Sequence, residues 1–174
     1  MKNTILLFLF LSICMNITAQ SREYSLELEK ELNAKVEKLV VDFKKTLNED
    51  EGFWKRFKLD TFVIERYVDL RIETDYSTQG MNQTMYEAER RYDKLLNIYY
   101  KILLEKLQGE DKKVLIDTQK SWIAFKEKEI KFIATLYSDK YTGGGTMYSN
   151  IRVGSVFEIT KKRTIELAQY LSNE

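Results

Sequence analysis

The chain contains no proline among its 174 residues, and this absence constrains the fold more than any other feature. Proline inside a helix removes a backbone hydrogen bond and clashes with the preceding turn, so a chain without it can continue a helix over many turns. The seven glycines lie near the ends of apolar-patterned segments. The sequence therefore predicts long, uninterrupted helices.

Apolar residues recur at steps of three or four, which places them on one face of a helix. The expected helices run from about residue 25 to 47, 61 to 73, 81 to 107, 111 to 137 and 155 to 171. Asp60 is suited to cap the expected helix 61–73. Because this segment lacks a clean apolar stripe and is rich in β-branched residues, a strand is an alternative there. The predicted fold class is all-α, a single-domain bundle of about five helices.

The expected helices 81–107 and 111–137 are separated only by Gln108, Gly109 and Glu110. Glycine commonly ends a helix, and Asp111 is suited to cap the next one. A connection this short predicts a long central antiparallel helical hairpin. We expect residues 20–74 to form a helical extension that packs on the same core as residues 75–174.

Both hairpin helices carry a row of polar and aromatic residues in step with the apolar stripe. A polar row beside a core either lies in water or is hydrogen-bonded by a neighbour. We expect a clasp between helices, in which Asp93 and Glu129 accept hydrogen bonds from Lys126 and Arg163, while Phe125 packs beside them. The predicted network comprises Asp93, Asn97, Tyr100, Gln119, Trp122, Lys126, Glu129 and Arg163.

These residues resemble the LprI-like lysozyme-inhibitor domain family. The similar motifs are Asp93-x-x-Leu96-Asn97-x-x-Tyr100, Gln119-x-x-Trp122-x-x-Phe125-Lys126-Glu127-x-Glu129, Gly143-Gly144-Gly145-Thr146 and Thr160-x-x-Arg163-x-x-x-Leu167. The resemblance covers about residues 75–171 and implies an exported, non-enzymatic protein that binds and blocks lysozyme. Lys126 stands where the family typically has arginine, and lysine cannot make the same planar two-point contact with a carboxylate.

The segment 138–154 contains three successive glycines and is predicted to be a long connection between helices. Loops of this length in a compact domain are usually functional or disordered. An inhibitor needs a projecting segment with aromatic anchors, although a simple connector is the alternative. The candidate partner-binding loop comprises Tyr141, Gly143, Gly144, Gly145, Thr146 and Tyr148.

The first nineteen residues have the three-part layout of a secretory signal peptide, with Lys2, an apolar run over 5–13 and a small residue at Ala19. The run is shorter than the roughly 20 residues that span a bilayer. We therefore expect an exported protein, periplasmic or secreted, without a membrane span. Cys14 resembles a lipoprotein cysteine, but a large Ile13 precedes it, so lipidation is the less favoured alternative.

Removal of the leader takes away Lys2, one of 28 basic residues, and leaves 27 basic and 27 acidic residues. This balance argues against a nucleic-acid partner, which calls for a basic face. The acidic stretches 27–31 and 49–51 are interpreted as solvated surfaces.

Histidine is absent, and the single cysteine lies in the leader. The sequence therefore predicts no catalytic residues, no cofactor and no metal site. Paired acids, Glu89 with Asp93 or Asp93 with Glu129, remain an enzymatic alternative for glycan hydrolysis, but a salt-bridged role is preferred for them.

The leading interpretation is an exported, monomeric, non-enzymatic envelope protein whose partner is lysozyme or another envelope protein. The alternatives are a general envelope interaction module and a small-ligand-binding helical module.

Overall fold

The computed structural model describes residues 26–47 and 52–172, and the regular structure in these ranges is entirely helical. A helix over residues 26–46 is followed by α2 (Phe53–Thr74), α3 (Thr78–Lys106), α4 (Gly109–Leu136), α5 (Asp139–Thr142) and α6 (Thr146–Ser172). The predicted all-α bundle is confirmed, and the strand alternative for residues 61–73 is wrong. The leader 1–19 with Cys14 and the acidic stretch 49–51 lie outside the described residues.

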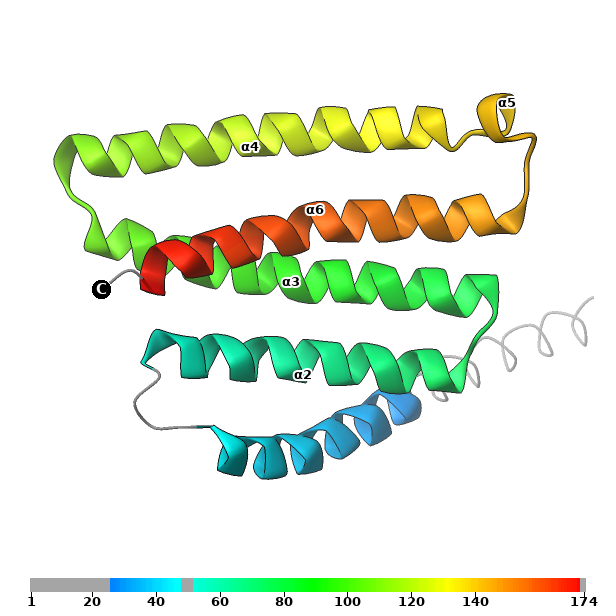
Figure 1. The fold of residues 1–174 in the computed structure, drawn as a ribbon, viewed down its shortest axis with the longest axis horizontal. Helices are drawn as coiled ribbons and strands as arrows, with labels where there is room; N and C mark the ends of the chain where they lie inside the picture. The colour runs from blue at the N-terminus through cyan, green and yellow to red at the C-terminus, as the bar shows by residue number, and fades with distance from the viewer. Residues whose placement is uncertain (1–25, 48–51, 173–174) are drawn as a thin grey trace, which may run out of the picture.

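The long helices lie side by side in a flat stack (Figure 1). α4 forms one edge and the helix 26–46 forms the opposite edge, with α6, α3 and α2 between them. α2, α3 and α4 alternate in direction, whereas α6 runs in the same direction as α3. In the part of the chain that the structure describes, no helix is both long and apolar enough to cross a bilayer.

The most extensive helix–helix contact is between α3 and α6, and α4 packs mainly on α6. α3 and α4 are antiparallel as expected, but α3 packs chiefly against α6. Small buried residues at steps of four, Thr160, Thr164 and Ala168, let α6 approach α3 closely. The Thr164 hydroxyl donates to the carbonyl of Tyr92 across this interface at 3.2 Å. A short connection sets the direction of the next helix, but the fit of side chains decides which helix it packs on.

α2 begins at Phe53, eight residues before the predicted start at Thr61. Phe53 and Phe57 belong to this helix, and their ring centroids lie 5.3 and 6.3 Å from that of Tyr99. Asp60, the predicted cap, lies inside the helix and accepts a hydrogen bond from the Tyr99 hydroxyl at 3.0 Å. Aromatic packing on α3 thus extends the helix past the position that the local sequence suggested as its start.

α6 begins at Thr146, nine residues before the predicted start at Ser155. The prediction of a long loop over residues 138–154 is therefore wrong. Tyr137, Ser138, the short helix α5 and the three glycines make the whole connection. Gly154, expected at a boundary, lies inside α6. A glycine inside a helix costs only about 1 kcal/mol, and the burial of the neighbouring Val153 and Phe157 offsets this loss.

The main core lies among α2, α3, α4 and α6. The helix 26–46 packs on another face of α2, through a small cluster of Leu32, Val36 and Tyr67. Ile64 and Val68 of α2 belong to the main core, so α2 links the two clusters. The buried apolar residues of the main core are Ile64, Val68, Ala88, Tyr92, Leu95, Leu96, Tyr99, Leu103, Leu115, Phe157, Leu167, Ala168 and Leu171.

Replacement of Leu96 by alanine tests this core, because the Leu96 side chain is 1% exposed. A cavity in a close-packed interior should lower the free energy of unfolding by about 2–5 kcal/mol. Ile98→Ala is the matched control, since Ile98 lies on the same helix but is 45% exposed; its effect should stay within about 0.5 kcal/mol. Urea unfolding monitored by circular dichroism measures both, and equal losses would contradict the assigned core.

Candidate functional site

Glu89 joins three helices. Its Oε1 accepts a hydrogen bond from the ammonium of Lys126 on α4 at 2.7 Å and from the hydroxyl of Thr160 on α6 at 2.9 Å. The Lys126 side chain is 18% exposed and that of Glu89 is 25% exposed. Water therefore screens this ion pair only in part.

A second polar contact joins α4 to α6. The side-chain oxygen of Gln119 accepts hydrogen bonds from Nε and Nη2 of Arg163 at 3.1 and 3.0 Å. Gln119 and Arg163 are both buried. The remaining Nη1 of Arg163 donates to Glu166 of its own helix at 3.0 Å. This contact orients a buried guanidinium that would otherwise lack a partner on α4.

The predicted acceptors of the clasp are wrong. Lys126 donates to Glu89, and Arg163 donates to Gln119 and Glu166, instead of the expected Asp93 and Glu129. Glu89 lies one helical turn before Asp93 and is the acid that reaches both α4 and α6.

The other members of the predicted network do not all join helices. Asp93 accepts a hydrogen bond from Asn97 of its own helix at 3.2 Å. Tyr100 and Trp122 are partly buried at the margin of the main core, with the Lys126 ammonium 5.5 Å from the Trp122 ring centre. Glu129 is partly exposed. Phe125, which was expected to pack beside the network, is 52% exposed.

A third polar contact joins α2, α3 and α6 through Glu65. Its Oε1 accepts from the Tyr92 hydroxyl at 2.6 Å and from the Lys161 ammonium at 2.7 Å. Burial, followed by the hydrogen bond to Glu65, raises the pKa of Tyr92 above its usual range. Burial alone would also raise the pKa of Glu65, but the hydrogen bonds from Lys161 and Tyr92 outweigh it and lower that pKa.

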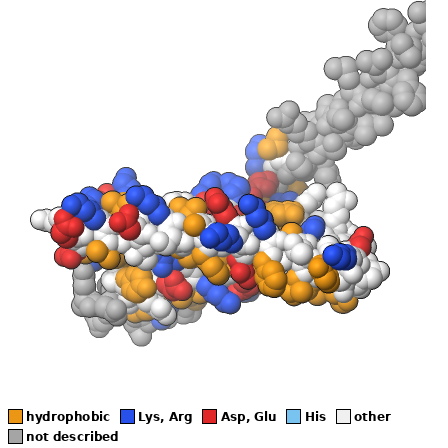
Figure 2. Space-filling view, turned by 90° about the horizontal axis from the view of Figure 1, so that it is seen from above, with side chains coloured by type: hydrophobic (Ala, Val, Ile, Leu, Met, Phe, Trp, Pro, Cys, Tyr) orange, Lys and Arg blue, Asp and Glu red, His pale blue; other side chains and the backbone are white. Residues whose placement is uncertain are grey.

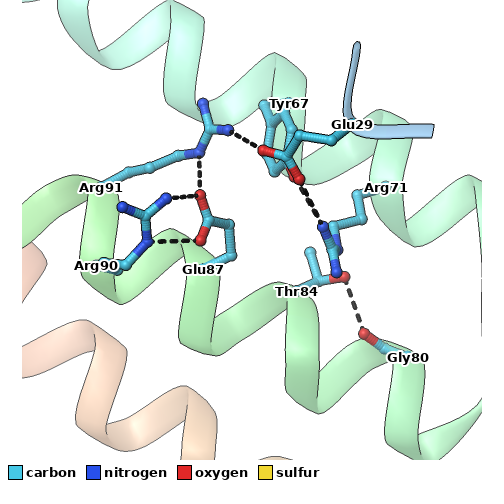
Figure 3. Close-up of polar contacts among 8 residues, drawn as sticks. All are labelled: Glu29, Tyr67, Arg71, Gly80, Thr84, Glu87, Arg90 and Arg91. Carbon is cyan, nitrogen blue, oxygen red and sulfur yellow. Dashed lines mark hydrogen bonds and ion pairs between the residues drawn. The ribbon is translucent and has the colours of Figure 1, made fainter. Parts of the chain in front are cut away.

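Glu29 attaches the helix 26–46 to α2 and α3 (Figure 3). Its carboxylate accepts from the Tyr67 hydroxyl at 2.8 Å, from Arg91 at 3.1 Å and from Arg71 at 3.4 Å. The Arg91 guanidinium also lies 3.5 Å from the centre of the Tyr67 ring. The interpretation of residues 27–31 as a solvated surface is therefore wrong for Glu29.

Arg91 continues this network along α3 to Glu87 (Figure 3). Glu87 accepts from Nε of Arg91 at 2.7 Å and from Arg90 at 2.7 and 2.6 Å. Burial alone would raise the pKa of the Glu87 carboxyl, but the hydrogen bonds from Arg90 and Arg91 outweigh it and hold the pKa below its usual value.

These contacts share a pattern that the sequence analysis missed. The three largest fully buried side chains are tyrosines, and each donates its hydroxyl to a carboxylate on another helix. The pairs are Tyr67 with Glu29, Tyr92 with Glu65 and Tyr99 with Asp60. A buried tyrosine needs a partner for its hydroxyl. Tyr92 and Tyr99 lie on the predicted apolar stripe of α3, so the stripe itself indicated that acids from neighbouring helices must face it.

α5 and the glycines that follow form a tip at one end of the stack, where α4 ends and α6 begins (Figure 1). Gly143, Gly144 and Gly145 have φ values of 74°, 87° and 124°. These backbone angles favour glycine, since side chains rarely tolerate them. The three glycines turn the chain sharply from α5 into α6, with the Asp139 side chain beside Gly144 and the Tyr148 ring beside Gly145.

Local contacts hold the tip in shape. The Thr142 hydroxyl donates to the carbonyl of Ser138 at 3.0 Å and accepts from the backbone amide of Gly144 at 3.3 Å. The Tyr137 and Tyr148 rings stack with centroids 6.3 Å apart. Tyr148 is therefore a packing residue of the tip, and it was predicted as a residue that contacts a partner.

The exposed side chains of the tip include two large apolar ones beside the charged Asp139 and Lys140 of α5. Tyr141 on α5 is 60% exposed and Met147 on α6 is 62% exposed. Thr146 is also exposed, at the first position of α6. The tip thus combines a backbone fixed by internal contacts with two large side chains that point away from the core.

An open groove of about 400 Å³ lies between the helix 26–46, α2 and α3. Apolar residues line part of it, and Asn33, Asp60 and three basic side chains of α3 line the rest. The lining residues are Asn33, Asp60, Val63, Ile64, Arg90, Arg91, Lys94, Leu95 and Ile98. Within residues 26–47 and 52–172, no group of three or more acidic, histidine or cysteine side chains is placed to hold a metal ion.

The chain was compared with models of known families. The model of a family described as "Lysozyme inhibitor LprI" matches residues 72–167, which is more than half of the chain. The matched region includes the contacts of Glu89 and Gln119 and the whole tip, and it excludes the helix 26–46 and nearly all of α2. No curated protein and no solved structure matches the chain.

Gln119→Ala should destabilise the fold far more than Asp93→Ala. Loss of Gln119 leaves two buried nitrogens of Arg163 without an acceptor, and an unpaired buried charged donor costs about 3 kcal/mol. Asp93 contacts only its own helix among the hydrogen bonds of the described residues, so its loss should cost less than about 1 kcal/mol. Thermal and urea unfolding of both variants measure the difference; a larger loss for Asp93→Ala would restore the clasp expected from the sequence.

The low pKa of Glu87 should make the fold sensitive to acid. An acid with a lowered folded-state pKa stabilises the fold above its unfolded pKa, and this contribution is lost as the pH falls through the folded pKa. The melting temperature should therefore decrease below about pH 4.5, the ordinary glutamate value. Glu87→Gln should have a lower melting temperature at pH 7 and a shallower decrease between pH 5 and pH 3.

Glu105→Gln is the control for this pH series, because Glu105 is an exposed glutamate on the same helix. It should keep the wild-type melting temperature at pH 7 and the wild-type decrease in melting temperature between pH 5 and pH 3. If the melting temperature of the wild type and of Glu87→Gln fell equally between pH 5 and pH 3, the stabilising role assigned to the Glu87 carboxylate would be contradicted.

Proposed function

Because the chain belongs to the LprI lysozyme-inhibitor family, we propose that it is an exported, non-enzymatic protein that binds a lysozyme and blocks its glycan-binding cleft. The observation that carries the proposal is the tip, which lies inside the matched region and projects at one end of the stack.

The shape of the tip suits insertion into a cleft. A glycan hydrolase binds its substrate between two carboxylic groups in a concave site, so an inhibitor must be narrow enough to enter it. Gly143 to Gly145 add no side-chain width, and Tyr141 and Met147 supply apolar contact area beside them. The contacts of Thr142 and Tyr148 fix the tip before binding, which reduces the entropy lost on association.

A non-enzymatic role is supported by the contacts of the buried and half-buried acids. Glu29, Glu65, Glu87 and Glu89 each accept hydrogen bonds from a basic side chain. A general acid needs a raised pKa near the working pH, whereas basic neighbours lower the pKa of Glu65 and Glu87. Export is supported by the leader-like layout of residues 1–19.

Small-ligand binding is a second candidate function, favoured by the groove of about 400 Å³. Its volume falls within the range of ligand pockets, roughly 300–1,000 Å³. Arg90 and Arg91 of its lining are paired with Glu87 and Glu29, and Asp60 adds an acid. The groove would therefore suit a small, largely apolar ligand with an anionic group near Lys94. It lies between the family-matched region and the helix 26–46, so this function would be separate from lysozyme inhibition.

Lysozyme inhibition is tested by the hydrolysis of peptidoglycan in the presence of the purified protein. We expect the wild type to inhibit at least one lysozyme among several of different types. The double variant Tyr141→Ala with Met147→Ala should inhibit about 30-fold more weakly, as expected when exposed anchors of a binding surface are removed. Its melting temperature should be unchanged, because both side chains are more than half exposed.

Tyr170→Ala is the matched control for the tip. Tyr170 is 54% exposed and lies near the opposite end of α6. Its removal should leave inhibition unchanged. If the wild type inhibits no lysozyme, the proposed function is wrong; if the Tyr170 and tip variants lose equal activity, the tip is not the contact surface.

A further inference from the structure

α4 is the least buried of the long helices within the family-matched region. Over 28 residues it buries only Leu115, Gln119 and Ile133, and these face α6 and the main core. α3 and α6, of similar length, each bury eight residues. Most of the surface of α4 is therefore available to another molecule.

Part of that surface is apolar. Val114, Phe125, Phe132 and Leu136 are 65%, 52%, 58% and 44% exposed. With 3.6 residues per turn, these four side chains fall within about 40° of one another around the helix, and their centre lies roughly 100° from the centre of the buried residues. They form one stripe about 33 Å long, calculated from the rise of 1.5 Å per residue. Figure 2, which views the molecule from the α4 side, shows hydrophobic side chains exposed on this face among the charged ones.

The two halves of this α4 stripe differ in size. The amino-terminal half presents Val114 followed by the small polar residues Thr118 and Ser121, whereas the carboxyl-terminal half presents Phe125, Phe132 and Leu136. If two copies of the stripe packed side by side in parallel, large side chains would face large ones and small side chains would face small ones. An antiparallel pair sets the large half of each copy against the small half of the other, which allows close packing along the whole length.

The charges beside the stripe allow the same arrangement. Asp117 lies on one flank in the amino-terminal half, and Lys128 and Lys131 lie on the same flank in the carboxyl-terminal half, as 3.6 residues per turn requires. A two-fold axis across an antiparallel pair brings identical flanks together. Asp117 of each copy, which pairs with Lys120 of its own helix at 3.2 Å, then lies opposite Lys128 of the other, and Lys113 on the same flank lies near Lys131. The formal net charge of only +1 means little repulsion between copies.

We propose that the α4 stripe is the interface of a symmetric dimer, in which α4 packs antiparallel against α4 of a second copy with the two-fold axis near Ser121 to Phe125. This differs from the monomer expected from the sequence. Dimerisation would leave the tip of each copy exposed at opposite ends of the α4 pair, because the two helices run in opposite directions. It does not depend on lysozyme binding.

Light scattering of the purified protein tests the proposal between about 1 μM and 1 mM, the Kd range of weak to moderate protein pairs. At the highest concentrations we expect the wild type to have the mass of two chains. Phe125→Ser should have the mass of one chain at every concentration. Val41→Ser is the matched control, because Val41 is 57% exposed on the helix at the opposite edge of the stack; it should dimerise as the wild type does. A wild type that is monomeric throughout would overturn the proposal.

Cross-linking with a short thiol-reactive linker tests the orientation. Chains with Val114→Cys mixed with chains with Phe132→Cys should cross-link to each other, whereas neither variant alone should do so. Cross-linking of Val114→Cys to itself would show a parallel pair and overturn the proposal. If Phe125→Ser weakens lysozyme inhibition without any change in mass, the stripe is instead part of the lysozyme contact and the dimer is again excluded.

Discussion

The arrangement of the helices depends on the hydroxyl groups of three buried tyrosines. Each hydroxyl lies where water cannot satisfy it, and each is satisfied by a carboxylate on a neighbouring helix: Glu29 for Tyr67, Glu65 for Tyr92 and Asp60 for Tyr99. Such contacts add less to net stability than to a unique arrangement, because desolvation of the acid offsets much of the attraction. A slip of one helix past another would leave a donor and an acceptor unpaired inside the protein. The tyrosines therefore fix the positions of the helix 26–46, α2 and α3 relative to one another.

α4 is attached by different means. Only two of its buried residues are apolar, and polar contacts through Gln119 and Lys126 connect it to α6 and α3. A helix attached along a narrow strip leaves a wide outer surface and places its carboxyl-terminal end, with the tip, at the periphery. The proposed inhibitory contact and the proposed dimer interface both follow from this weak burial of α4. The inhibitory contact uses α5 and the start of α6, beyond the end of α4, and the dimer interface uses the α4 stripe, so separate variants can test each one.

The sequence predicted the existence and type of most helices but not all of their ends. α3 and α4 were placed to within three residues, because their apolar periodicity is regular and a glycine marks the break between them. The starts of α2 and α6 were missed by eight and nine residues. In both cases local signals, a capping aspartate at Asp60 and a glycine at Gly154, were outweighed by the packing of aromatic or branched side chains on α3. The candidate site shows the same division: Gln119, Lys126 and Arg163 do join helices, but both predicted acceptors, Asp93 and Glu129, were wrong.

The sequence by itself determined that this chain is helical, where its regular apolar faces lie, and which family it resembles, because periodicity, proline content and motif spacing are properties of a single segment. Only the tertiary structure decided that α6 is the main partner of α3, that Glu89 rather than Asp93 accepts from Lys126, and that Phe125 faces outward. The physical reason is that periodicity defines a face without defining what covers it. Which helix covers that face depends on how side chains from segments far apart in the sequence fit together, and no single segment contains that information.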